Sequence, residues 1–183
     1  MDATPTTKVS IFEGLKESFQ LVEESLTGMD AVACLQGFDG KWNIGQQLEH
    51  LLLSNQPVLK GLHFPKDQLM ARFGRLERAP HSYLTLKSFY LQTLKEKQVK
   101  APPRFEAQLD ASYSLEKSLT TWHDLAAAFQ EVATQWTEEE LDTYAMMHPA
   151  IGLLSVREML FFVIYHNAHH LLQIEFIKEQ LKQ

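Results

Sequence analysis

The sequence predicts an all-α fold, a four-helix bundle with a long crossover between the second and third long helices. Apolar residues recur at helical spacing in four separate segments, each of which opens with a side chain able to cap a helix. A stretch broken by prolines and a glycine, residues 63–112, separates the second segment from the third. Strand signals are weak throughout. We therefore expect four long helices of antiparallel type in one domain spanning residues 1–183.

The first two predicted helices have clear starts. Ser10 opens a capping-box spacing, and helical periodicity then continues to a stop at Gly28. Asn43 can cap the second helix, with Gln46 in the place of the capping-box acid. Pro57 lies inside the second apolar pattern, so it should kink this helix or end its regular part just before the proline.

The crossover and the third helix follow. Within residues 63–112, the apolar spacing from Tyr83 to Leu94 predicts one helix of roughly three to four turns. Ser114 caps a third long helix that runs to about residue 136, and Thr137 opens a short helical turn. The linker 143–154 contains methionines and a histidine that either cover an end of the bundle or simply fill a loop.

The last predicted helix, residues 155–183, carries a metal-binding pattern. Ser155 has a glutamate at capping-box spacing, and no glycine or proline interrupts the helix afterwards. His166 and His170 lie one turn apart, so both imidazoles can point at one atom. An arbitrary pair of this kind more often hydrogen-bonds to neighbours or to water. This pair lies between Phe162 and Ile177 on the apolar face, where unpaired polar groups are costly, and this position favours a metal.

A metal held by such a pair needs a third protein ligand from another helix. Catalytic zinc sites commonly have three protein ligands and one position open to water. His50, on the second predicted helix, is the best third donor in the sequence. The remaining histidines outside the last helix are expected to be solvated: His63, His81, His123 and His148.

Composition excludes several classes of function. The net charge of −6 and the scattered basic residues argue against a nucleic-acid partner. A single cysteine, Cys34, leaves no intrachain disulfide and no zinc-ribbon spacing. We find no signal-peptide pattern and no apolar run long enough to span a bilayer, so we expect a cytoplasmic protein without a membrane partner.

Two runs of sequence match a known family. The run WNIGQQLEHL at residues 42–51 and the run PAIGLLSVREMLFFVIYHNAHHLLQI at residues 149–174 resemble the DinB-like (DinB/YfiT) superfamily. The resemblance implies a four-helix bundle that holds a divalent metal through His50, His166 and His170. It also implies that His169 is not a ligand. Neutral imidazoles suit several metals, of which we expect zinc or nickel.

By the same resemblance, we expect a metal-dependent thiol S-transferase acting on a small-molecule substrate. Characterised relatives include transferases that use bacillithiol or mycothiol, so a low-molecular-weight thiol is the expected cosubstrate. The polar groups near His50 could orient the bound ligand, or they could form a solvated helix face: Gln46, Gln47 and Ser54.

Two other functions and a homodimeric assembly are also compatible with the sequence. A metal-dependent hydrolase would activate water at the same metal, but Glu49 points about 100° away from His50 on a helix and is a poor general base. A non-catalytic, stress-associated metal-binding or assembly module is also open, with the metal joining two helices. Phe161, Phe162 and Tyr165 make the last helix apolar on more than one side, which predicts a homodimer.

Overall fold

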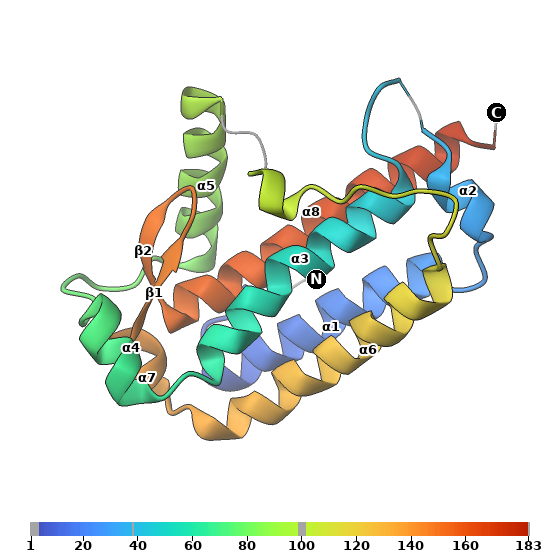
Figure 1. The fold of residues 1–183 in the computed structure, drawn as a ribbon. Coiled ribbons are helices and arrows are strands. Elements are labelled where there is room, and N and C mark those ends of the chain that lie inside the picture. The colour runs from blue at the N-terminus through green and yellow to red at the C-terminus, as the bar shows by residue number, and fades with distance from the viewer. Residues whose placement is uncertain (1–3, 38, 99–101, 183) are drawn as a thin grey trace.

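The computed structural model describes residues 4–37, 39–98 and 102–182 and contains four long helices (Figure 1). These are α1 (Lys8–Leu26), α3 (Ile44–Leu62), α6 (Leu115–Val132) and α8 (Val156–Gln180). The predicted fold class, an all-α four-helix bundle with a long crossover after its second long helix, is confirmed.

The order of the long helices around the bundle differs from a simple up-and-down arrangement. Both α1 and α3 contact α6 and α8, so α1 lies diagonally opposite α3. The colours in Figure 1 show that α3 and α6 run in the same direction, as do α1 and α8. The expected antiparallel arrangement is therefore only partly right. The connection between α3 and α6 is long enough to return the chain to the end at which α3 begins.

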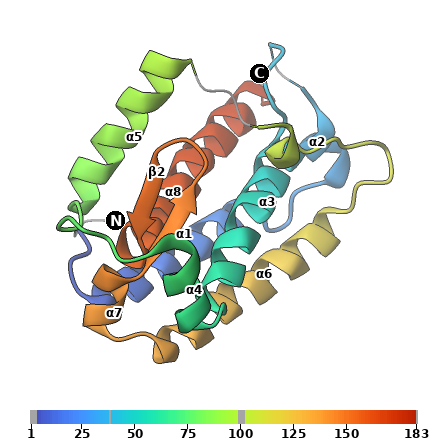
Figure 2. The ribbon, with the colours of Figure 1, turned by 60° about the vertical axis from the view of Figure 1, so that its left-hand side comes forward.

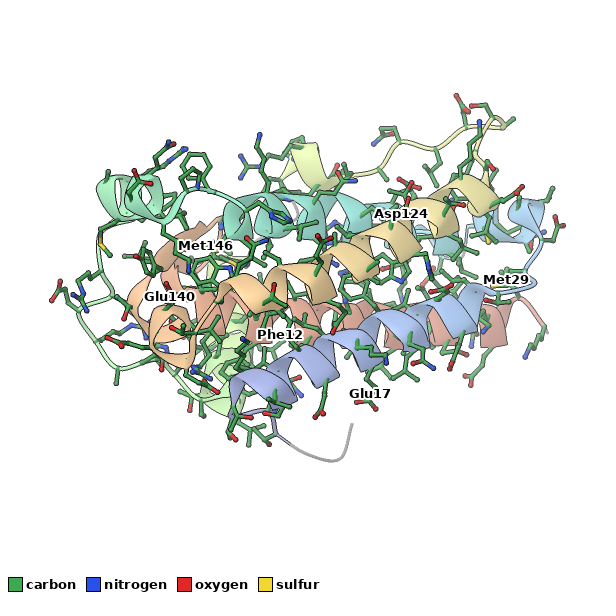
Figure 3. All side chains as sticks on the ribbon, turned by 90° about the horizontal axis from the view of Figure 1, so that it is seen from below. Phe12, Glu17, Met29, Asp124, Glu140 and Met146 are labelled. Atoms are coloured by element: carbon green, nitrogen blue, oxygen red, sulfur yellow. The ribbon has the colours of Figure 1, made fainter. Side chains whose placement is uncertain are left out.

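The core lies between the four long helices. Figure 3 shows α1 and α6 side by side with side chains between them. Trp122 and Trp136 are both buried, and each indole N–H donates to a backbone carbonyl, that of Phe19 and that of Leu62 respectively. These bonds satisfy the polar atom of each large aromatic ring while the rest of the ring fills the core.

Helix boundaries differ from the sequence predictions at two places. Thr7 caps α1 and forms a capping box with Ser10, so the helix begins earlier than expected because Ser10 completes the box from the third helical position. Pro57 does not end α3, which continues to Leu62. The proline side chain is exposed, and the helix loses one backbone hydrogen bond there without terminating.

The crossover contains more helix than predicted. The expected central helix is α5 (Tyr83–Lys97), and it is preceded by α4 (Lys66–Phe73) and followed by the short 3-10 helix η1 (Pro103–Phe105). A further helix that the sequence pattern did not indicate, α2 (Ala31–Leu35), lies between α1 and α3. The 3-10 helix η2 (Ala133–Gln135) and the predicted short turn α7 (Glu138–Thr143) follow α6.

The linker 143–154 forms a β-hairpin, which no pattern in the sequence predicted. β1 (Ala145–His148) pairs antiparallel with β2 (Gly152–Ser155). The hairpin and α5 lie side by side along the N-terminal half of α8 (Figures 1 and 2). Met146 packs against α3 at Gly61, where a Cβ atom would lie only 2.1 Å from the methionine Cε. Glycine at this position therefore lets the hairpin approach the bundle closely.

The hairpin and α5 also cover the apolar side of α8. Phe161, Phe162 and Tyr165 are all buried within the chain, and their rings contact Tyr83 and Tyr90 of α5. Across the described ranges, no helix combines the length and the apolar character that crossing a bilayer requires.

Candidate metal centre

Three buried histidines meet where α3 and α8 pack against each other. His50 comes from α3, and His166 and His170 come from successive turns of α8. The Nε2 atom of His166 lies 3.2 Å from that of His50 and 3.0 Å from that of His170. One nitrogen of each ring therefore faces a common point. Among the described residues, these three histidines are the group of side chains that could hold a metal ion.

The outer nitrogens of two rings have fixed partners. Nδ1 of His50 donates to the backbone carbonyl of Phe105 at 2.8 Å, and Nδ1 of His170 donates to Oε1 of Gln47 at 2.5 Å. Because a neutral imidazole carries one proton, these bonds leave both Nε2 atoms as lone-pair acceptors. Metal-binding histidines usually have such partners, which fix the tautomer and the orientation of the ring.

The arrangement fits a cation at the common point. Two unprotonated nitrogens face Nε2 of His166, and one proton could satisfy at most one of those contacts. Nδ1 of His166 is buried without a hydrogen-bond partner among the described residues, and it would carry the proton of the neutral ring when Nε2 binds a cation. A divalent ion would give all three lone pairs a partner at once, and imidazole nitrogen is its commonest protein ligand.

Burial also keeps the three rings in their neutral, metal-binding form. Burial lowers the pKa of His50, and it lowers the pKa of His166 and His170 well below the ordinary value. The other imidazoles nearby lower these pKa values further, because one charged ring disfavours a second.

Comparison with protein families identifies the chain. The model of the DinB superfamily matches residues 13–174. The chain belongs to the DinB superfamily. The resemblance found in the sequence is thereby confirmed.

Solved structures support the fold of this DinB-superfamily chain. YfiT from Bacillus subtilis is similar, with a TM-score of 0.64 and 15% sequence identity, covering 96% of this chain and 87% of that one. YfiT is described as a probable metal-dependent hydrolase with an unusual four-helix bundle topology. A search of proteins with curated functions found no match.

The three histidines open into a cavity of about 820 Å³ between α3, α5, α8 and the hairpin. Its walls are mainly apolar and aromatic, and Lys60 and Arg104 are its charged lining residues. None of the described residues that line it is an aspartate or a glutamate. Apolar residues that line the cavity include Trp42, Leu53, Tyr90, Leu94, Phe105, Met146, Met159, Phe162 and Tyr165.

The polar residues expected to contact substrate occupy different places. Ser54 lines the cavity, with Oγ 3.5 Å from Nε2 of His50. Gln46 completes the capping box of α3 and donates to the carbonyl of Ala107. Gln47 is buried and bonded to His170. Substrate contact by these residues stays a prediction, and the geometry gives Gln47 a role in orienting a histidine.

Two further histidines reach the cavity. His169 is half-buried and lines it, but its nitrogens do not join the three converging atoms. His148 is 6% exposed and also lines the cavity, so the prediction that it is solvated is wrong. Burial lowers the pKa of His148 to about 4. Local sequence gave no signal for this position, because the hairpin brings His148 back onto α8.

Proposed function

We propose that His50, His166 and His170 bind a divalent metal and that the chain is a metal-dependent S-transferase for a low-molecular-weight thiol. The observation that carries this proposal is a cavity with three neutral imidazoles and no carboxylate among its described lining residues. A thiol with an ordinary pKa of about 8.5 loses its proton far more easily than water. Thiol activation therefore needs no carboxylate base, whereas water activation gains from one.

The residues of the chain have separable tasks in this reaction. When bound, a divalent metal supplies a full positive charge that favours the thiolate form of a thiol beside it. The mainly apolar and aromatic walls offer few groups that would compete with the sulfur for hydrogen bonds. Lys60 and Arg104 give the cavity a positive charge, which favours an anionic thiol or electrophile. After the thiol has lost its proton to solvent water, the sulfur bonds to an electrophilic carbon while the bond from that carbon to its leaving group breaks.

The metal is proposed to be zinc or nickel, because both accept neutral imidazole ligands.

The homodimer also stays a prediction. That prediction rested on the apolar cluster of Phe161, Phe162 and Tyr165. These side chains are buried within one chain, so they cannot form the surface of a dimer interface. Light scattering at several concentrations measures the assembly state.

A metal-dependent hydrolase is the second candidate, and the description of YfiT favours it. In that reaction an imidazole would have to accept the proton of water, and His169 at the cavity wall is available for this. Glu49 does not reach the cavity, because its carboxylate accepts a hydrogen bond from Ser118 of α6.

The first experiment measures metal content by mass spectrometry after purification without a metal-binding tag. We expect close to one equivalent of metal in the native chain and a large loss in the His50→Ala and His166→Ala variants. The exposed His123 provides a matched control, and His123→Ala should keep the metal. A native chain that contains no metal and takes up neither zinc nor nickel would refute the proposed site.

A second measurement separates the candidate activities. Consumption of 1-chloro-2,4-dinitrobenzene is followed with and without bacillithiol, using native chain and His50→Ala. The transferase predicts turnover that requires both the thiol and His50. Thiol-independent hydrolysis of a nitrophenyl ester would favour the hydrolase. Lower thermal stability of the variants with no turnover of any substrate would favour the non-catalytic module.

A further inference from the structure

His148 uses only one of its two ring nitrogens to stabilise the hairpin. Its Nδ1 accepts hydrogen bonds from the backbone N–H groups of Ala150 at 3.1 Å and Ile151 at 3.3 Å. Pro149, between His148 and Ala150, has no N–H to donate. The side chain thereby satisfies two backbone donors in the turn that joins β1 to β2.

These two bonds determine where the proton of His148 lies. A nitrogen that accepts two N–H donors carries no proton, so the neutral ring is protonated at Nε2. The hydrogen bonds of His148 to other described residues all involve Nδ1, and Nε2 is not one of the fully buried polar atoms that lack a partner. Because His148 lines the cavity, this donor is available to a ligand or to water there.

The ring is held firmly on the cavity wall. It lies edge-to-face against Phe162, with centroids 4.3 Å apart, and against Tyr90, with centroids 5.7 Å apart. Phe162 also stacks on His166 at 4.9 Å. A single aromatic ring therefore separates His148 from the three converging histidines, and both lie in the same cavity.

We propose that Nε2–H of His148 is a positioning donor for an anionic oxygen of the substrate bound at the three-histidine site. The inference rests on the proposed function, since it assigns an orientation to the ligand of that site. The positive charges of Lys60 and Arg104 on the same cavity agree with an anionic ligand. The substrate class is accordingly a thiol with a carboxylate or similar oxygen anion near its sulfur.

Two substitutions separate the tasks of the two nitrogens. Asparagine keeps an acceptor oxygen close to the position of Nδ1, as in an Asx turn, but removes the Nε2–H donor. Glutamine places an amide N–H near the position of Nε2 but removes the acceptor from the turn. His148→Asn should therefore preserve the hairpin and lose the ligand contact, and His148→Gln should do the reverse.

The test uses the full chain loaded with cobalt(II), whose visible spectrum reports ligand binding. Three probes are titrated: mercaptoacetate, ethanethiol, which lacks the carboxylate, and acetate, which lacks the thiol. For His148→Asn we expect about tenfold weaker binding of mercaptoacetate and acetate, the size of one charge-assisted hydrogen bond, and unchanged binding of ethanethiol. His148→Gln should bind all three probes within about threefold of the native chain and melt at a lower temperature.

Each outcome decides one of the two proposals. If His148→Asn binds mercaptoacetate and acetate as tightly as the native chain does, His148 is only a turn cap and the inference fails. Equal weakening for ethanethiol also contradicts it, because that probe offers no oxygen acceptor. Failure of both thiols to perturb the cobalt spectrum of the native chain refutes thiol binding itself, and acetate still decides the role of His148.

Discussion

At the scale of single residues, the candidate site depends on what holds the far side of each imidazole. The carbonyl of Phe105 and the side chain of Gln47 hold Nδ1 of His50 and His170, which directs both Nε2 atoms inward. Such partners normally contribute strongly to metal affinity, because a ring that can rotate or change its tautomer binds less well.

Gln47 allows a direct test of this support. Replacing Gln47 by leucine removes the acceptor of His170 Nδ1–H, so we expect zinc or nickel affinity to fall by about 10- to 100-fold. Affinity is measured by competition with a chelator of known strength. Gln47→Glu is the matched control, since it keeps an acceptor at the same position. Equal metal affinity in the native chain and the leucine variant would contradict the assigned role.

The sequence predicted some of these residues for a clear reason. His166 and His170 lie four residues apart on one helix, so helical geometry alone brings the two rings together. His50 was found because it lies on a second long amphipathic helix. The roles of Phe105 and His148 depend on where the crossover and the hairpin return to the bundle, and no local pattern encodes that placement.

At the scale of elements, Glu158 connects the start of α8 to the crossover. Besides completing the capping box with Ser155, its buried carboxylate accepts bonds from Nη1 and Nη2 of Arg78, at 2.7 and 3.1 Å respectively. It also accepts from the backbone N–H of His81 at 2.7 Å. Burial raises the pKa of Glu158, but these hydrogen bonds outweigh burial and lower it overall. The carboxylate therefore fixes the loop from which α5 begins.

Substituting Glu158 by glutamine should loosen this connection. The amide cannot pair with Arg78 as an ion or accept all of these bonds, so we expect a loss of about 3 kcal/mol in the free energy of unfolding. Hydrogen exchange in α5 should also become faster, which mass spectrometry of its peptides measures. Glu175, a partly exposed carboxylate on the same helix, supplies the control, and Glu175→Gln should cost less than about 1 kcal/mol. Unchanged exchange in α5 would show that other contacts hold it.

The same elements show where sequence patterns reach their limit. Long helices with caps and sustained periodicity were predicted to within a few residues, because each pattern is local. The strands β1 and β2 have four residues each, too few for alternation to be recognised. Their turn has no Asn-Gly or Asp-Gly signal, and instead relies on the His148 side chain and on Gly152 at φ 83°.

At the scale of the whole molecule, the fold keeps several imidazoles neutral in its interior. Burial lowers the pKa of His50, His148, His166 and His170. In the unfolded chain each of these side chains titrates near its ordinary value of about 6.5. Between that pH and the lower pKa of the folded state, the unfolded chain binds more protons than the folded chain. The free energy of unfolding of the metal-free protein must therefore fall as the pH falls through this window.

His148 permits a quantitative form of this prediction, because its folded pKa is about 4. On acidification from about pH 7 to about pH 4.5, neutral His148 should account for a loss of roughly 2 kcal/mol in the free energy of unfolding. The metal-free His148→Asn variant, which has no group titrating there, should lose that much less than the native chain. Urea unfolding at both pH values, followed by the fluorescence of the buried Trp122 and Trp136, measures the difference. If acidification lowered the free energy of unfolding equally in the two proteins, His148 would protonate as easily in the folded chain as in the unfolded one. Its burial would then impose no cost on the charged ring, which would contradict the prediction.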